Sequence, residues 1–554
     1  MNNDNNINIS FEEFKKSVLN DFRIVCESRE TSLIGRKEVL SGKGSFGIFG
    51  DGKELAQIAM SRCFRKGDFR SGYYRDQTFM LAKKEMTIKQ FFAALYGHAD
   101  IDFEPQSGGR QMVAHFSTQS LNEDGSWKNI TGQYNSASDI SCTAGQMPRL
   151  VGLAQASKIY RDNKKLSNWK SFSKNGNEIA WGTIGNASTS EGHFFEAINA
   201  AGVLQIPMIV SIWDDEYGIS VHSKYQTTKE NISEILKGFR RNKKEKGFEI
   251  LKVKGWDYPS LIDTYERAEK IAREQHVPVI IHVIEMTQPQ GHSTSGSHER
   301  YKDKKRLQWE DDFDCIKKFK NWIINNNLSS EDNLDEIIKE SKKKVLLEKQ
   351  SAWKEYQKPI LEELDQIIFL LDDLIKNTKN GVFIKPIKDQ LILDKKLNPH
   401  RKNIFSAIKA TLRLLRKEKN NSKDKLKEIL AKWKLDNNER YSSHLHSQSK
   451  WQCTQIEEVL PNYDIDCQEV DGRIILRDNF DYILSKYDEC IIFGEDSGQI
   501  GGVNQGLEGM QKKHGELKVS DTGIREATIL GQGIGMAMRG LRPIAEIQYL
   551  DYLL

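Results

Sequence analysis

Two loops of the sequence carry residues suited to holding a phosphate and a divalent cation. The first reads Gly185-Asn-Ala-Ser-Thr-Ser-Glu-Gly192, and its small side chains would let a ligand approach the backbone. Because the first amides of a helix favour phosphate, this loop is a candidate phosphate site. The second reads Trp213-Asp-Asp-Glu-Tyr-Gly-Ile-Ser220 and supplies two carboxylates, which are hard oxygen ligands for Mg²⁺. From these loops alone, a tight turn and solvated carboxylates explain the residues equally well.

Both loops follow predicted strands of one sheet. Apolar runs predict strands over 178–184, 207–213, 249–254 and 279–284. Helices are predicted after the first loop and over about 260–276, the first with Phe194, Phe195, Ile198, Ala201 and Leu204 on one side. Alternation of strands and helices predicts an α/β fold with a doubly wound parallel sheet, in which ligands bind beyond the carboxyl ends of the strands.

Composition limits the class of protein. The 554 residues carry 82 Lys and Arg against 78 Asp and Glu, a balance of +4 that argues against a nucleic-acid binder. No run reaches the roughly 20 apolar residues of a membrane span, and residues 1–10 read as a disordered polar tail rather than a signal peptide. The seven cysteines form no Cys-x-x-Cys pair, which favours reduced thiols and a cytoplasmic protein.

The chain divides into three parts by composition. Residues 11–302 are rich in glycine and aromatic residues, as expected for a globular domain. Residues 303–440 are dominated by Lys and Glu, and apolar residues at helical spacing predict a charged helical connector with a linker near 420–424. Glycine and β-branched residues return in 441–554, which predicts a second, incomplete α/β domain.

Several short motifs decide between the interpretations of the two loops. Their order resembles that in the α subunit of 2-oxo acid dehydrogenases: Tyr74-Arg75-Asp76, Gly109-Arg-Gln-Met112, Gln146-Met-Pro148, Ser190-Glu-Gly192, Tyr217-Gly-Ile-Ser220 and Gly291-His-Ser-Thr-Ser295. A later set resembles the β subunit: Phe493-Gly-Glu-Asp496, Gly501-Gly-Val503, Ile524-Arg-Glu526, Gly531-Gln-Gly-Ile-Gly535 and Ile544-Ala-Glu-Ile-Gln548. The chain therefore resembles a fused α/β first, decarboxylating component, most similar to the branched-chain type, with a thiamine-diphosphate-binding fold.

This resemblance implies a cofactor site and the roles of its residues. Contacts to thiamine diphosphate are implied for Tyr74, Arg75, Ser141, Thr143, Gly185, Ala187, Ser188, Ile219, His292 and Glu526. Mg²⁺ would be held by the side chains of Asn186 and Asp215 and by the Tyr217 carbonyl. Catalytic roles are implied for Glu526, which would hydrogen-bond the pyrimidine ring, and for His292 and His115, which are candidates for proton transfer.

The resemblance also implies the reaction and the partners. The thiazolium of the cofactor would take up the electrons released when a 2-oxo acid loses CO₂. The acyl group would then pass to the lipoyl arm of an acyltransferase core, and the chain would form a homodimer equivalent to an α₂β₂ tetramer. A branched-chain substrate, 3-methyl-2-oxobutanoate, is favoured. Alternatives are a relative acting on pyruvate, 2-oxoglutarate or acetoin, and a degenerate, non-catalytic homologue.

Two departures from the family pattern bear on these expectations. The family places an acid in the first loop and an amide in the second, whereas this chain has Asn186 and Asp215. We expect a compensated swap, because one carboxylate near the metal matters more than its position. The sequence also stops at Leu554, before the rest of a β subunit, so we expect the chain alone to be inactive or poorly soluble without a separate remainder.

Other motifs have simpler interpretations. Gly42-Lys-Gly-Ser-Phe-Gly47 and Gly50-Asp-Gly52 imitate nucleotide and thiamine loops, but no strand precedes them, so turns before a helix near Glu54 are predicted. His444 and His446 lack further metal ligands nearby, and the basic cluster at 240–246 lacks interleaved aromatic residues, so solvated surfaces are expected for both.

Overall fold

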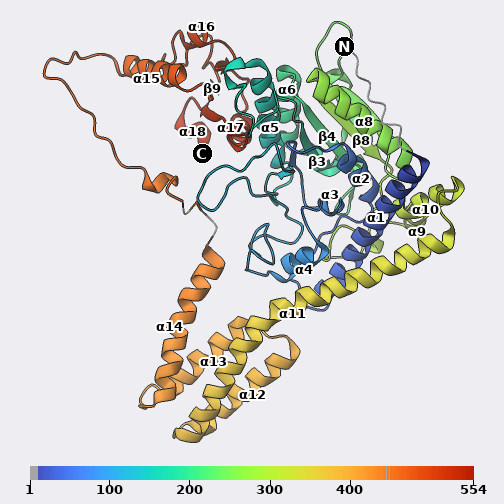
Figure 1. The fold of residues 1–554 in the computed structure, drawn as a ribbon, viewed down its shortest axis with the longest axis vertical. Helices are drawn as coiled ribbons and strands as arrows, with labels where there is room; N and C mark the ends of the chain where they lie inside the picture. The colour runs from blue at the N-terminus through green and yellow to red at the C-terminus, as the bar shows by residue number, and fades with distance from the viewer. Residues whose placement is uncertain (1–9, 444–445, 448) are drawn as a thin grey trace.

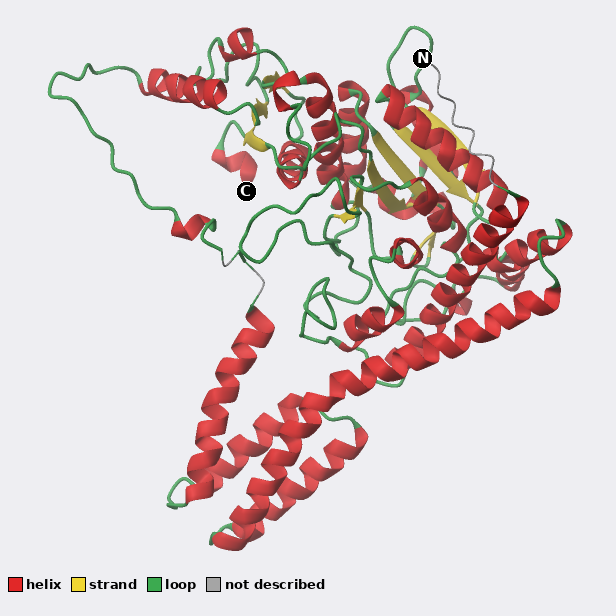
Figure 2. Ribbon diagram, in the orientation of Figure 1, coloured by secondary structure: helices red, strands yellow, loops and turns green. Residues whose placement is uncertain are grey.

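The main sheet confirms the predicted doubly wound parallel arrangement. The computed structural model describes residues 10–443, 446–447 and 449–554, so residues 1–9 of the predicted tail at 1–10 lie outside the described residues, as does His444. Six parallel strands run in the order β2-β1-β3-β4-β8-β7. Figure 2 shows strands of this sheet in yellow among the red helices. Their bounds are Phe69–Ser71 (β1), Asn135–Ser136 (β2), Ala180–Gly185 (β3), Met208–Trp213 (β4), Glu249–Lys254 (β7) and Val279–Ile284 (β8). The last two strands have the bounds that the sequence predicts.

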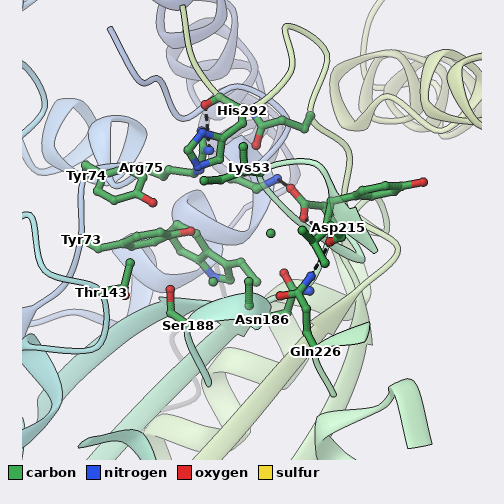
Figure 3. A pocket seen from close by; sticks show the side chains of 18 of the residues that line it. Lys53, Tyr73, Tyr74, Arg75, Thr143, Asn186, Ser188, Asp215, Gln226 and His292 are labelled. Carbon is green, nitrogen blue, oxygen red and sulfur yellow. Dashed lines mark hydrogen bonds and ion pairs between the residues drawn. The ribbon is translucent and has the colours of Figure 1, made fainter. Parts of the chain in front are cut away.

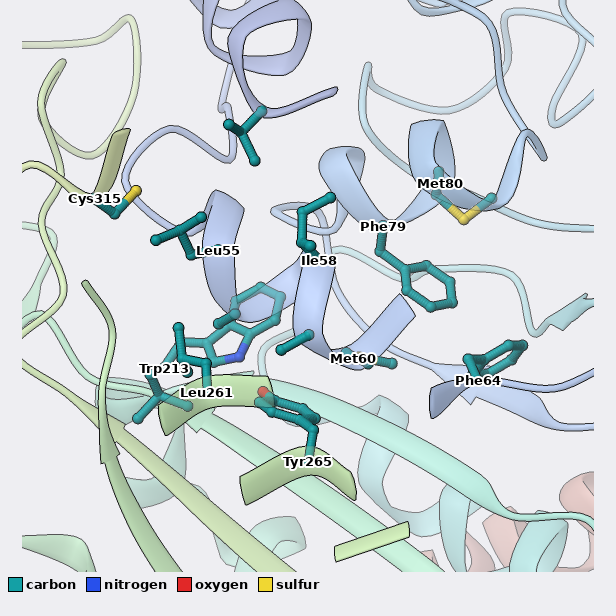
Figure 4. Packing of buried hydrophobic residues seen from close by; sticks show 14 of the residues in the cluster. Leu55, Ile58, Met60, Phe64, Phe79, Met80, Trp213, Leu261, Tyr265 and Cys315 are labelled. Atoms are coloured by element: carbon teal, nitrogen blue, oxygen red, sulfur yellow. The ribbon is translucent and has the colours of Figure 1, made fainter. Parts of the chain in front are cut away.

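Helices cover both faces of this sheet. Alternate β4 side chains separate two cores, because Ile209 and Trp213 face one cluster while Val210 and Ile212 face the other. The first core includes α2 (Glu54–Cys63) and α8 (Tyr258–Gln275), whose apolar side chains pack over Trp213 (Figure 4). The second includes α5 (Gln146–Asp162) and α6 (Gly192–Leu204). Burial on both faces explains why these strands read as continuous apolar runs.

The α6 helix has one deviation from its predicted face. Phe194, Ile198 and Ala201 are fully buried, but Phe195 is 37% exposed. A step of one residue turns a helix by about 100°, which carries Phe195 from the centre of the buried stripe, where Phe194 lies, to its edge.

The N-terminal region and the connector are helical. Ser10 caps α1 (Phe11–Leu40), which is followed by α2, α3 (Gln77–Lys83) and α4 (Ile88–Tyr96). The connector contains α9 (Lys304–Asp312), α10 (Cys315–Asn325), α11 (Glu331–Asn377), α12 (Gly381–Leu397), α13 (Arg401–Leu414) and α14 (Asn421–Ser442). Figure 1 shows the long α11 leaving the sheet beside α1 and α4, with α12, α13 and α14 packed at its far end.

The predicted linker at 420–424 is wrong. Helix α14 starts there, because the Asn420 side chain accepts hydrogen bonds from the amides of Ser422 and Lys423. Asn is among the most effective N-cap residues, and the charged residues that suggested a linker form the first helical turn instead. No helix of the described chain has both the length and the apolar character needed to cross a membrane.

The C-terminal part contains a second, smaller parallel sheet. Its strands lie in the order β10-β9-β11, with bounds Val519–Asp521 (β10), Cys490–Gly494 (β9) and Arg542–Glu546 (β11). Four helices accompany them: α15 (Gly472–Lys486), α16 (Met510–His514), α17 (Glu526–Met538) and α18 (Leu550–Leu553). Residues 453–471, which precede α15, are exposed and contain one short 3₁₀ turn.

Helix α17 docks this sheet onto the N-terminal part. It packs against α5 (Figure 1) so closely that a Cβ on Gly152 would lie 1.9 Å from the Gln532 carbonyl oxygen. At the end of α17, the buried Arg539 forms an ion pair with Glu178 at 2.8 Å. Glycines on both helices thus allow backbone contact between segments nearly 400 residues apart.

Candidate functional site

A cavity of about 390 Å³ opens at the carboxyl ends of β3 and β4, where the sequence predicts a ligand site (Figure 3). Eleven predicted residues line it: Tyr74, Arg75, Thr143, Gly185, Asn186, Ala187, Ser188, Asp215, Tyr217, Ile219 and His292. Side chains that the sequence analysis did not single out as site residues also line it, among them Lys53, Tyr73, Gln226, Gln288 and Lys302. The two loops therefore meet at one cavity.

The first loop is a compact turn that leads into α6. Residues Asn186–Ser190 form a 3₁₀ turn, and the Thr189 hydroxyl donates to the Asn186 carbonyl at 2.6 Å. The loop is tied to the segment that follows the second loop, because the Ser190 hydroxyl donates to the Gln226 carbonyl at 3.1 Å. Small residues and the start of a helix at the cavity wall suit an anionic ligand.

The two carboxylates of the second loop point to different places. Asp214 binds His282 of β8 at 2.9 Å and accepts the Glu216 amide at 2.8 Å, so it fixes the loop to the sheet. Asp215 faces the cavity, where its Oδ1 accepts the Tyr217 amide at 3.2 Å. Only the second of these carboxylates is therefore available to a ligand.

Lys53 is the site residue that sequence reasoning missed. Its ammonium donates to Asp215 Oδ2 at 2.8 Å and to the Thr287 carbonyl at 2.7 Å, and the side chain is only 2% exposed (Figure 3). Burial raises the pKa of Asp215, but the charges of Lys53, Lys302 and Arg75 outweigh it and lower that pKa to about 2. Asp215 is therefore a carboxylate that is already paired.

The sequence feature that could have drawn attention to Lys53 is the Gly50-Asp-Gly52 motif directly before it. As predicted, it forms a turn before α2. Gly52 has a φ of +84°, and a Cβ there would lie 2.0 Å from the Thr287 carbonyl oxygen. The close approach that requires this glycine brings the next residue, Lys53, to the same carbonyl.

Arg75 and His292 lie beside Lys53, across the cavity from Asn186 and Ser188 (Figure 3). The buried Arg75 guanidinium donates to the carbonyls of Phe49 and His292, the latter at 3.0 Å. Burial and the nearby Arg75 charge lower the pKa of His292 to about 4, so its imidazole is neutral at neutral pH. These two residues thus offer one fixed positive charge beside a neutral ring.

Comparison with known proteins places this fold in a family. The family described as dehydrogenase E1 component matches residues 28–360, more than half of the chain. The chain belongs to the dehydrogenase E1 component family. Residues 468–554 match the transketolase pyrimidine binding domain, so an E1-like part and a pyrimidine-domain part are joined in one polypeptide. The predicted fusion is therefore confirmed.

Individual relatives agree with this division. The chain is 28% identical over 305 residues to the 2-oxoisovalerate dehydrogenase subunit alpha of Bacillus subtilis, covering 54% of this chain and 80% of that protein. It is 45% identical over 78 residues to the 2-oxoisovalerate dehydrogenase subunit beta of Pseudomonas aeruginosa, covering 14% of this chain and 22% of the relative. It is 49% identical over 73 residues to the pyruvate dehydrogenase E1 component subunit beta of Acholeplasma laidlawii, covering 13% and 22%. The chain thus spans about a fifth of these beta relatives.

Three residues predicted for the E1 site lie outside the cavity lining. His115 forms a hydrogen bond with the Ser141 hydroxyl at 2.9 Å, and neither side chain lines the cavity. Glu526 begins α17, and its charge, together with burial, raises the pKa of the neighbouring Glu495. Within the described chain, the cavity therefore brings together the residues predicted to contact the diphosphate. Glu526, which is predicted to contact the pyrimidine ring, does not line it.

The E1 family also implies a thiamine diphosphate and a divalent metal. The side chains of the cavity suit the diphosphate better than the metal. Lys53, Arg75 and Lys302 outnumber Glu191 and Asp215 among the charged lining residues, which suits a diphosphate. The predicted metal site has one carboxylate, Asp215, and an ammonium already occupies its Oδ2. The donor set therefore fits a diphosphate but not a resident Mg²⁺.

Proposed function

We propose that the chain binds thiamine diphosphate and acts in the oxidative decarboxylation of a 2-oxo acid. One observation carries this proposal: the E1 fold places Arg75, Lys53 and the start of α6 around one cavity at the sheet edge. The cavity is anchored at two strand ends, and its charged lining matches the anionic end of the cofactor.

Each part of the cavity has a proposed task. The Arg75 guanidinium and the amides of the loop at Gly185, Ala187 and Ser188 bind the diphosphate. Tyr74, Thr143 and Ile219 lie at the wall and contact the remainder of the cofactor. When bound, thiamine diphosphate supplies a thiazolium carbon that adds to the oxo carbon and takes up the electrons released with CO₂. The neutral imidazole of His292 is suited to accept or donate a proton at the substrate oxygen.

The pyrimidine end of the site is proposed to come from a second copy of the chain. Glu526 lies outside the cavity lining of its own chain, while the family relationship assigns a pyrimidine-binding role to this part. In the homodimer that we propose, Glu526 of one copy holds a hydrogen bond to the pyrimidine ring bound at the other. Ser141 and His115 would lie beside that ring and the substrate.

We propose a branched-chain 2-oxo acid, 3-methyl-2-oxobutanoate, as the substrate. The matches to the alpha and beta subunits of 2-oxoisovalerate dehydrogenases support it. Pyruvate is the second candidate, because the C-terminal part is 49% identical to a pyruvate dehydrogenase beta subunit over 73 residues. The proposed acyl acceptor is the lipoyl arm of a partner acyltransferase core in the cytoplasm.

Calorimetry with the full chain tests the cofactor proposal. Thiamine diphosphate should bind, and thiamine without phosphates should bind at least about tenfold more weakly, because the cavity grips the anionic end. Inorganic diphosphate should compete with the cofactor. Equal affinity for thiamine and thiamine diphosphate, or no binding of either, would contradict the proposal. A panel of 2-oxo acids with an artificial electron acceptor then separates the two candidate substrates.

A further inference from the structure

Lys53 pairs with Asp215, one of the three residues at which the family pattern predicts a metal. Its ammonium lies between the Asp215 carboxylate and the Thr287 carbonyl, and Figure 3 shows it entering the cavity beside Arg75. A lysine ammonium has three N–H donors, and these two contacts use two of them. Because Lys53 also lines the cavity, the third donor is available to an anion bound there.

The position of this cation is built into the fold. Helix α2 begins one residue after Lys53, and the Gly52 turn holds the preceding backbone against Thr287. From the same helix, Gln57 Nε2 donates to the Arg75 carbonyl at 2.8 Å. A single helix start therefore sets both Lys53 and Arg75 toward the cavity, with Lys53 almost fully buried.

The charges around Asp215 argue against a divalent ion in addition to Lys53. A Mg²⁺ bound to Asp215 at about 2.1 Å would lie within a few ångströms of the ammonium on the same carboxylate. Two like charges at that distance repel strongly in a buried site. The exchange at positions 186 and 215 leaves one carboxylate at the site, as in the family pattern, and that carboxylate is already paired with Lys53. Arg75 adds further positive charge nearby, and Lys302 is paired with Glu310 at 2.6 Å.

We propose that the Lys53 ammonium replaces the divalent metal at the diphosphate, so that this cavity binds thiamine diphosphate without Mg²⁺. The inference rests on the proposed cofactor function. In this arrangement Asp215 orients Lys53 rather than coordinating a metal, and the neighbouring Lys53 and Arg75 both contact the diphosphate. The exchange of acid and amide at positions 186 and 215 would then accompany the replacement of a bound Mg²⁺ by the Lys53 ammonium.

Metal-free calorimetry on the full chain tests this proposal. Thiamine diphosphate should bind the chelator-treated protein with an affinity within about threefold of that measured in millimolar Mg²⁺. Lys53→Gln should lose at least about tenfold in affinity without metal, since it loses a charge-assisted contact, and should recover part of it when Mg²⁺ is added. The matched control is Lys83→Gln, since Lys83 also donates to two carbonyls, those of Ser61 and Phe64, but does not line the cavity.

The outcomes separate this inference from the cofactor proposal. Wild-type binding that disappears on chelation and returns with Mg²⁺ would overturn the inference, keep the cofactor function and support the predicted metal site at Asn186, Asp215 and Tyr217. No binding in either condition would overturn both. Electron paramagnetic resonance with Mn²⁺ gives a second readout on the wild-type chain: free Mn²⁺ should remain unbound in the presence of the cofactor–protein complex. A tightly bound Mn²⁺ would contradict the replacement.

Discussion

Asp214 and Asp215 are neighbours in the second loop, but their side chains point in different directions and have different partners. Asp214 points to His282 inside the sheet, and Asp215 points to Lys53 in the cavity. Successive side chains at the end of a strand face opposite sides, so one carboxylate fixes the loop and the other meets the ligand. Ligand binding at this site therefore depends on Asp215, whose side chain faces the cavity, and on the Lys53 ammonium that pairs with it.

Loss of the Arg75 guanidinium should weaken cofactor binding. Charge-assisted hydrogen bonds contribute about 1.5–3 kcal/mol, so Arg75→Gln should lower the affinity for thiamine diphosphate roughly 10- to 100-fold by calorimetry. Arg267→Gln is the matched control, because its side chain is 58% exposed and it does not line the cavity. The melting temperature of both variants should be measured, since Arg75 also holds the His292 carbonyl. An unchanged affinity in a folded Arg75→Gln variant would remove Arg75 from the site.

His276 should make the chain sensitive to mild acid. Burial and then the Arg161 charge lower the pKa of His276 from 6.5 to about 4. The unfolded chain therefore takes up this proton at a higher pH than the folded chain, so stability falls as pH drops from about 6.5 toward 4, by up to roughly 3 kcal/mol. His276→Asn, which suits the local φ of +53°, should lose less melting temperature over this range than wild type.

The control for this titration is His446→Asn, because His446 is exposed. Its melting temperature should follow the wild-type pH profile. Parallel profiles for wild type and His276→Asn would show that His276 is protonated at its ordinary pKa in the folded chain.

At the scale of elements, local patterns predicted the sheet and long-range contacts decided the site. The bounds of β7 and β8 were predictable because buried parallel strands are short apolar runs between helices. The start of α14 was missed because a single cap, Asn420, outweighs a charged composition. The Gly50-Asp-Gly52 motif marks the turn before Lys53 but does not reveal its role, since its partners Asp215 and Thr287 lie more than 160 residues away in sequence. The resemblance supplied most of the cavity residues but not this cation.

The contact between α5 and α17 should depend on glycine. A Cβ at Gly152 would lie 1.9 Å from the Gln532 carbonyl oxygen, so Gly152→Ala must push the two helices apart. Overpacking of this kind costs about 1–3 kcal/mol, and we expect a lower melting temperature and faster proteolysis within 453–471. Gly472→Ala is the control in a helix, because nothing lies within 4 Å of its Cβ position, and it should be neutral or stabilising. Equal effects of the two variants would contradict the close packing.

At the scale of the whole molecule, one chain does not bring all predicted site residues to one cavity. The N-terminal sheet supplies Arg75, Lys53 and His292, whereas Glu526 lies on α17, which is held against α5 outside the cavity lining. Helix α17 is fixed there by backbone contact and by the Arg539–Glu178 ion pair, and in this position Glu526 does not line the cavity of its own chain. A second copy is the simpler source of that acid.

Mixed dimers test this arrangement directly. Arg75→Gln and Glu526→Gln chains, each weak alone, should restore one intact site when they pair, because one copy then supplies Arg75 and the other supplies Glu526. The readout is exchange of the thiazolium C2 proton of added thiamine diphosphate into D₂O, which requires no acyl acceptor. With equal mixing, half of the dimers are mixed and one of the two sites in each is intact, so about a quarter of the wild-type rate should return. Loss of an acid–base group typically costs 10²- to 10⁴-fold, so this recovery is easily measured. If both groups act within one chain, every site in the mixture carries a defect, and the rate stays at the level of the single variants.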